Sequence, residues 1–343
     1  MKQIWWKVLS VILLGYTLIS GFLIPLQPGL LPADQSTVQN GELTLSVTGH
    51  RTHFTQATDN QAVLANKDLR ICGEILNVAD DRHLTARFVV PDTLYSRSFN
   101  LFVNNAVDGT MFLQGVAYYQ DAIVDSSRVQ RGCEVAVSTE KSAGFAFPFQ
   151  PTIFETIRNL LFHVPMWFTM FLIMLISVIH SVKYLMNPKR ESDLKAETAA
   201  RVGLLFGVLG LVTGSIWARF TWGAWWVNDP QLNGAFVTFL IYVGYLVLRA
   251  GVGDDLKKAR VSAVYNIFAY VILFILLMIL PKFSESLHPG KGGNPGFNAY
   301  DLNSSLRAVF YPAVIGWMLL GYWIYQIQLR TNRLRTKLFY NEK

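Results

Sequence analysis

Charged residues and cysteine are scarce in this chain. Of its 343 residues, 15% are charged and 52% are hydrophobic, and only 2 are cysteines. Together with a mean hydropathy of +0.30, the shortage of charge excludes an ordinary soluble domain and indicates a multi-span membrane protein. The sequence also lacks a Gly-x-x-x-x-Gly-Lys-Ser/Thr motif, so we expect no ATP binding through a phosphate-binding loop.

Six apolar stretches approach the length of about 20 residues that a bilayer crossing needs. They are 4–24, 160–185, 199–217, 235–248, 261–280 and 308–328, the fourth being slightly short. Pro25 and Pro28 follow the first stretch and no small-x-small cleavage site does, so we interpret it as a retained anchor and not as a signal peptide. The expected fold class is an all-α polytopic membrane protein with six transmembrane helices.

Lysine and arginine are sparse at one set of span ends. These ends carry only Arg158, Arg219, Lys282, Lys291 and Arg307, and most other basic residues lie at the opposite ends. Because cytoplasmic loops are enriched in Lys and Arg, we expect both termini to be cytoplasmic, with 331–343 as a cytoplasmic basic tail. This asymmetry explains the net charge of +7, so the expected surroundings are membrane lipid, and no nucleic acid is expected as a partner.

A long segment outside the membrane separates the first span, 1–27, from the others. Within 28–150, the stretches 43–48, 83–90 and 98–103 alternate apolar with polar residues, which indicates half-buried strands. We therefore expect an inserted β-rich, sandwich-like periplasmic domain that ends in a linker.

Both cysteines, Cys72 and Cys133, belong to this inserted segment. An oxidising compartment permits a disulfide between them, but a thiol pair that exchanges with a partner and two plain core thiols are also compatible with the sequence. The histidines of the segment, His50, His53 and His83, have no haem-binding string beside them, and we interpret them as structural.

An aromatic segment with an acid at its end lies between the third and fourth spans. It reads Trp222-Gly223-Ala224-Trp225-Trp226-Val227-Asn228-Asp229. A single tryptophan there would be an interfacial anchor, but three close together favour a platform that packs against a flat apolar ring. Asp229 is expected to hold the loop through backbone N–H groups.

Two histidines flank this platform on the outer side. His163 lies at the outer end of the second span, and His288 precedes the sixth. Haem needs axial nitrogen ligands, an apolar cradle and a counter-charge for its propionates, and two neutral imidazoles supply the first of these. The sequence therefore predicts transiently bound haem b with His163 and His288 as iron ligands. Arg158, at the same membrane level as His163, is the expected propionate partner.

These strings resemble a known family. Thr213-Gly214-Ser215-Ile216-Trp217 and the 222–229 segment resemble the tryptophan-rich WWD signature of haem-handling proteins in cytochrome c maturation (CcmC, CcmF and CcsA). Phe162-His163-Val164-Pro165 resembles the histidine motif of CcmC proteins. The resemblance covers 1–27 and 151–330, where it implies a five-helix haem-handling domain with a WWD loop at 217–233.

The resemblance also implies partners and a role. A CcmC-like protein would deliver haem to a periplasmic haem chaperone of the CcmE type, beside an ABC-type complex with CcmA, CcmB and CcmD. It would be a ligand-handling component and not an enzyme. The family pattern is incomplete, because Asn228 replaces its third tryptophan and Gln231 its arginine, which removes one expected propionate contact.

Two other functions fit parts of the sequence. One is a cytochrome c synthetase of the CcsA or CcmF type, which shares the WWD loop but has more spans and further histidines within the membrane. Here His180 lies about 25 Å deeper than His163 along the same span at 1.5 Å per residue, so it cannot ligate the same iron. The other is a membrane anchor that displays a protein- or glycan-binding sandwich, with the tryptophans merely interfacial.

Overall fold

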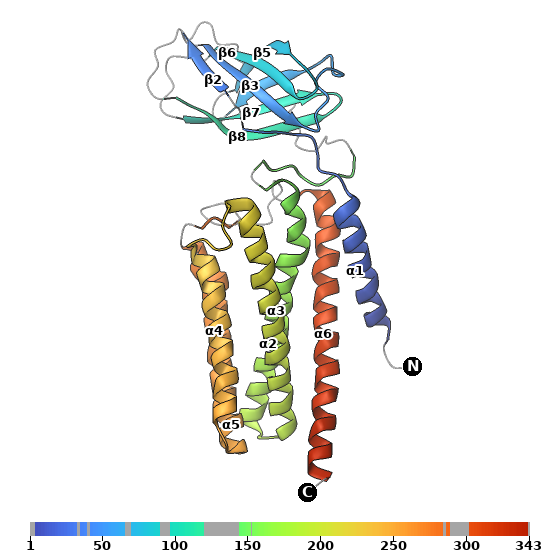
Figure 1. The fold of residues 1–343 in the computed structure, drawn as a ribbon, viewed down its shortest axis with the longest axis vertical. Coiled ribbons are helices and arrows are strands. Elements are labelled where there is room, and N and C mark those ends of the chain that lie inside the picture. Colours follow the sequence, from blue (N-terminus) through green and yellow to red (C-terminus); the bar gives the residue numbers. More distant parts are fainter. Residues whose placement is uncertain are drawn as a thin grey trace. The chain divides into compact units, whose positions relative to one another are not determined.

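The structure is a computed structural model, and it describes residues 4–32, 35–39, 42–65, 70–89, 97–119, 144–151, 153–283, 286–288 and 302–341. The chain divides into two compact units (Figure 1). One unit combines Met1–Leu23 with Glu155–Lys343, and the other is Ile24–Phe154.

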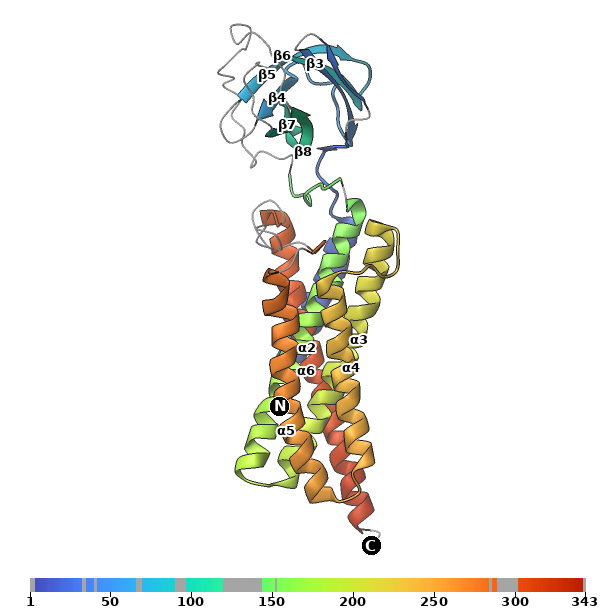
Figure 2. The same ribbon diagram turned by 90° about the vertical axis from the view of Figure 1, so that its left-hand side faces the viewer.

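The first unit is a helical bundle. Its helices are α1 (Trp5–Leu23), α2 (Leu160–Met186), α3 (Arg190–Trp222), α4 (Pro230–Gly251), α5 (Asp255–Phe274) and α6 (Ser304–Asn341), with a 3-10 turn η2 (Phe154–Asn159) before α2 and a π-turn η3 (Ile275–Ile279) and a 3-10 turn η4 (Leu280–Lys282) after α5. Within the described residues, 6 helices are long and apolar enough to cross a membrane. The expected polytopic membrane protein is therefore confirmed, and Figure 2 shows its helices side by side.

Two helices extend well beyond their apolar stretches. α3 begins at Arg190 and α6 continues to Asn341. The extra turns are rich in Glu, Lys and Arg, which are good helix formers, and ion pairs such as Glu197 to Arg201, at 2.9 Å, link successive turns. Hydropathy marks where a chain crosses the bilayer, whereas backbone hydrogen bonding continues through the polar ends.

Close contact between α2 and α3 depends on glycine. A side-chain carbon added to Gly203, Gly207, Gly210 or Gly214 of α3 would lie within 3.0 Å of Met174, Met170, Trp167 or His163 of α2, respectively. Small residues at such spacing let two membrane helices approach closely. These four glycines thereby fix the direction of the α2 side chains that face α3 and their position along the bundle axis.

The two ends of the bundle differ in chemistry. We call the end that carries Lys195, Arg330 and Arg333 the basic end, and the end that carries Trp217, Trp222 and the 223–229 loop the tryptophan end. A buried arginine clamps the basic end, where Arg249 of α4 donates to Asp193 at 2.7 Å and to Glu197 at 2.9 Å, both on α3.

The second unit is a curled antiparallel sheet. Its strands are β1 (Gly29–Leu30), β2 (Gln35–Gln39), β3 (Glu42–His50), β4 (Gln61–Ala65), β5 (Arg70–Val78), β6 (His83–Val89), β7 (Arg97–Asn105) and β8 (Gly109–Tyr119). The pairing order is β1-β3-β6-β5-β4-β7-β8, with β2 also paired to β3. The expected strands at 43–48, 83–90 and 98–103 correspond to β3, β6 and β7.

The pairing differs from the expected sandwich, because the described strands form one 8-stranded sheet and not two. Its end strands β1 and β8 contact each other, so the sheet closes in a barrel-like manner around its own core. Alternate residues of β3, Leu43, Leu45 and Val47, face that core. Alternation in a sequence reveals one buried face, but it does not tell whether a second sheet or the same curled sheet covers it.

The polar residues singled out in this unit have protein partners. His53 Nδ1 lies 2.9 Å from the buried Asp108, His83 Nδ1 lies 2.9 Å from Asp80, and the His50 ring stacks on Phe149 at 5.0 Å. Cys72 on β5 is disulfide-bonded, and Cys133 lies outside the described residues.

Candidate functional site

His163 is buried in the first turns of α2 and faces α3. Its Nδ1 lies 3.1 Å from the Gly210 carbonyl oxygen and 3.1 Å from Thr213 Oγ1. A carbonyl only accepts hydrogen bonds, and the Thr213 hydroxyl already donates to the Leu209 carbonyl at 2.8 Å. Nδ1 therefore carries the hydrogen, and in the neutral imidazole Nε2 keeps its lone pair.

The surroundings of His163 hold this ring in place. A side-chain carbon at Gly214 would lie 2.7 Å from His163 Cε1, so only glycine accepts the ring at this height. Trp217 of α3 and Trp167 of α2 meet the imidazole edge to face, with centroids 5.8 and 6.3 Å away. Trp217 is held in turn by a hydrogen bond from its Nε1 to Thr156 Oγ1 at 3.1 Å.

The tryptophan loop folds back on the helix that precedes it. α3 ends at Trp222, because Gly223 takes the left-handed conformation with φ +78°, which favours glycine. Ser215 Oγ of α3 then donates to the Trp225 carbonyl at 2.8 Å. The side chains of Trp225 and Trp226 remain 59% and 40% exposed, so two indoles project from the end of the bundle.

Asp229 joins this loop to the segment after α5. The residue is 2% exposed and caps α4 by accepting from the backbone N–H groups of Gln231 and Leu232 at 2.9 and 3.2 Å. Its second oxygen accepts from Ser286 Oγ and from the Leu287 N–H, each at 2.8 Å. Because four donors converge on it, this carboxylate fixes the position of 286–288 against the start of α4.

His288 lies beside that carboxylate. Its Nδ1 lies 3.5 Å from Asp229 Oδ1, and its ring meets Trp222 edge to face at 5.6 Å. Burial alone would raise the pKa of Asp229, but the interactions with His288, Ser286 and the Leu287 N–H outweigh it and lower that pKa well below its usual range. The carboxylate is therefore charged at neutral pH.

The structure gathers most of the predicted site at one end of the bundle. His163 contacts Trp217 and His288 contacts Trp222, both near the same end of α3. His180, in contrast, lines a cavity at the basic end.

Arg158 has a structural role near these site residues. Its guanidinium donates to Glu155 Oε2 at 2.7 Å and to the Gly21 carbonyl of α1. It lines a pocket of about 280 Å³ that the rings of Phe22, Phe162 and Trp217 also line. Arg158 thus ties α1 to the start of α2 beside an aromatic cavity.

Several residues of the site escaped the sequence analysis. The spacing of Gly210 and Gly214 relative to Gly203 and Gly207 was a usable signal, because small residues at such intervals mark close helix contacts. Ser286 carried no signal, since nothing in its own segment reveals that it donates to Asp229 two helices earlier in the chain.

Known proteins resemble the bundle. The family model described as "CcmC: Heme exporter protein C" matches residues 133–343. "Heme exporter protein C" of Paracoccus denitrificans is 28% identical over 197 residues, 57% of this chain and 80% of that protein. The protein of the same name from Bradyrhizobium diazoefficiens is 34% identical over 122 residues, 35% of this chain and 46% of its own.

A second group of relatives matches a shorter part. "Cytochrome c biogenesis protein CcsA" of Prochlorococcus marinus subsp. pastoris is 35% identical over 85 residues, 25% of this chain and 27% of that protein. The names of both groups concern haem and cytochrome c biogenesis. Because the matching family model spans more than half of the chain, the chain belongs to the CcmC, or heme exporter protein C, family.

Proposed function

We propose that this protein holds haem b transiently at its tryptophan end and passes it on for cytochrome c maturation, with His163 and His288 as axial ligands. One observation carries the proposal. Each imidazole has an oxygen near its Nδ1, the Gly210 carbonyl at 3.1 Å for His163 and the Asp229 carboxylate at 3.5 Å for His288. Histidines that bind metals have this arrangement, because the outer partner fixes the tautomer and leaves Nε2 to ligate.

The residues present fit such a group in two further respects. The His163 ring packs against Gly214, and a side chain at that position would occupy the space of the ring. The glycine therefore keeps this space open for the imidazole. When bound, haem supplies an iron whose two axial positions accept imidazole nitrogens. The half-buried Trp222 and the exposed Trp225 and Trp226 would pack against the porphyrin faces or edges.

Charge at the site has two proposed sources. Asp229 would act through His288, since its negative charge strengthens the donor nitrogen of the ring that it orients. Arg158 is the proposed propionate partner, because it lines the aromatic pocket with Phe22, Phe162 and Trp217. A guanidinium offers five N–H donors in a planar fork.

We further propose the topology and the partners. The sparse basic residues at the tryptophan end favour a periplasmic location for it and for the 28–150 segment, with both termini cytoplasmic in a bacterial inner membrane. The named relatives are heme exporter proteins, which supports a complex with CcmA-, CcmB- and CcmD-like components and haem delivery to a CcmE-like periplasmic chaperone. The exposed Trp225 and Trp226 are the proposed contact for that chaperone.

A synthetase function has less support. The CcsA relative matches only 25% of this chain and 27% of its own length, whereas the CcmC model matches 133–343. We therefore propose a carrier that catalyses no bond formation.

A transfer experiment separates the carrier from the synthetase. Haem-loaded protein is mixed with a purified periplasmic chaperone of the CcmE type or with apocytochrome c, and the partners are separated by affinity tag. Haem moving to the chaperone, and none becoming attached to apocytochrome in the chaperone's absence, is the expected result. Covalent attachment to apocytochrome by this protein alone would refute the carrier proposal.

A further inference from the structure

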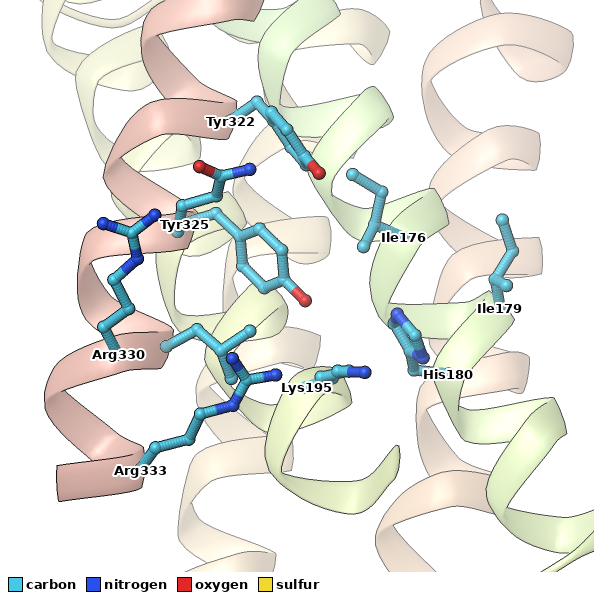
Figure 3. Close-up of a pocket in the computed structure, with 10 residues that line it drawn as sticks. Ile176, Ile179, His180, Lys195, Tyr322, Tyr325, Arg330 and Arg333 are labelled. Carbon is cyan, nitrogen blue, oxygen red and sulfur yellow. The ribbon is translucent and has the colours of Figure 1, made fainter. Parts of the chain in front are cut away.

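A second cavity lies at the basic end of the bundle, far along α2 from His163. It has a volume of about 520 Å³ and is lined by side chains of α2, α3 and α6 (Figure 3). The proposed haem site uses none of these side chains. Figure 3 shows Lys195 of α3 and Arg333 of α6 extending into the same space, opposite His180 of α2.

The lining changes in polarity along the bundle axis. The charged ends of Arg333 and Lys195 lie together with the His180 ring toward the basic end, the Tyr325 hydroxyl lies further in, and Ile176 and Tyr322 lie deepest, whereas Arg330 turns its guanidinium to the other side of α6. Arg333 and Tyr322 are about 16 Å apart along α6 at 1.5 Å per residue. The lining thus passes from cations and an imidazole, through a tyrosine hydroxyl, to apolar side chains. A membrane lipid has a matching order from its phosphate to its acyl chains.

Positive charge is in excess in this cavity. Lys195 Nζ lies 3.4 Å from Glu191 Oε1, and Arg333 Nε donates to the same oxygen at 3.1 Å. Two cations therefore share one carboxylate. His180 Nδ1, a buried atom, has no hydrogen-bond partner within the part of the chain that the structure describes. The cavity thus offers more donors than its own residues satisfy.

Hydrogen bonds between helices hold the walls in place. Ser177 Oγ of α2 donates to the Ala196 carbonyl of α3 at 2.6 Å, and Asn332 Nδ2 of α6 donates to Thr198 Oγ1 of α3 at 3.0 Å. These bonds join α3 to both α2 and α6, next to the lining residues Ile176, Lys195 and Arg333 in the sequence.

We propose that this cavity binds an anionic glycerophospholipid, with its phosphate between Lys195 and Arg333 and its acyl chains toward Ile176. Basic pockets between membrane helices recognise such headgroups, and tyrosines suit the interfacial level just below them. The bound lipid would hold α6 against α2 and α3. Free phosphate shares the charge but leaves the apolar depth of the cavity unfilled.

The test uses the full-length protein, delipidated in a mild detergent and titrated with phosphatidylglycerol or phosphatidylcholine under native mass spectrometry. The variant is Lys195→Gln with Arg333→Gln, which removes the two cations that share Glu191. The matched control is Lys257→Gln with Arg260→Gln, which removes two exposed cations of α5 at the same end. A cation near a lipid headgroup contributes about 1 kcal/mol, or about fivefold in affinity.

Wild type and control should bind one phosphatidylglycerol in preference to phosphatidylcholine, and the variant should bind it about 25-fold more weakly, at two factors of about fivefold. Equal affinity in variant and control, or no preference over phosphatidylcholine, would overturn the proposal. Two further arms use inorganic phosphate and haemin. Phosphate that binds while the lipid does not, or haemin with a Soret band that His180→Leu abolishes, would assign the cavity to another ligand.

Discussion

Asp229 Oδ1 lies 3.5 Å from His288 Nδ1, although α4 and α5 separate the two residues in the sequence. The same carboxylate caps α4 and accepts from Ser286 and Leu287. One buried acid therefore both caps a membrane helix and lies beside a proposed haem ligand. In the proposed site this acid would act on haem through a histidine, which would explain why a carboxylate belongs in a loop that binds an anionic ligand.

Replacing Asp229 should weaken haem binding without unfolding the bundle. Asp229→Asn keeps an oxygen for the α4 cap but loses the charge that orients His288, and loss of such an outer partner costs about 10- to 100-fold in metal affinity. Haem titration of the purified protein measures the effect. The matched control is Asp254→Asn, since Asp254 caps α5 by accepting from the Lys257 N–H at 2.6 Å. Equal haem affinity in the two variants would contradict the role given to Asp229.

Replacing Gly214 should displace His163. In Gly214→Ala the added methyl would lie 2.7 Å from His163 Cε1, and overpacking of this kind costs about 1–3 kcal/mol. The thermal midpoint should fall, and the haem spectrum should shift because the ring changes position. Gly15→Ala is the control, since nothing lies within 4 Å of that added carbon. A Gly214→Ala protein with unchanged stability and spectrum would show that the close fit has no consequence.

Trp225 and Trp226 should bind haem and should not be needed to keep the protein in the membrane. Burying one large apolar side chain against a ligand contributes about 1.5–3 kcal/mol, so Trp225→Ala and Trp226→Ala should each lower haem affinity about tenfold or more. Haem per protein and protein per membrane are measured together, with Trp5→Ala as a control on an exposed tryptophan of α1. Less protein in the membrane at unchanged haem per molecule would instead indicate an interfacial anchor.

The 24–154 unit should fold alone and leave haem unbound. Its core side chains pack among themselves, and His50, His53 and His83 each interact with a neighbour of the same unit. We propose that it adjusts partner docking. A soluble 24–154 fragment should be β-rich by circular dichroism and show no Soret band with haemin. A sharp band that His50→Ala with His53→Ala removes would reassign haem binding to this unit.

The membrane helices could be predicted from the sequence more completely than the site. Long apolar runs are visible because a bilayer selects residue type directly, so the positions of α2 and α5 were predictable. The polar extensions of α3 and α6 were not, because helical hydrogen bonding continues where hydropathy stops. The curled sheet could not be predicted for a related reason. Alternation of apolar and polar residues in β3 and β6 shows that one face is buried but not what covers it.

The site, too, could be predicted from the sequence only in part. The tryptophans and the two histidines could be singled out by residue type and by their common membrane end. The contact between Asp229 and Ser286 depends on how α4 and α5 pair, which no local pattern encodes. Arg158 was chosen for its level along α2, but its contacts with Glu155 and Gly21 depend on the approach of α1, which lies far away in the sequence.

The most direct test of the central claim is the absorption and electron paramagnetic resonance spectrum of the haem-loaded protein, compared among histidine variants. Wild type should be low-spin with two imidazole ligands, and His163→Ala and His288→Ala should each lose that signature, whereas His180→Ala should keep it. If the double variant His163→Ala with His288→Ala retains the wild-type spectrum and haem content, these histidines are not the iron ligands.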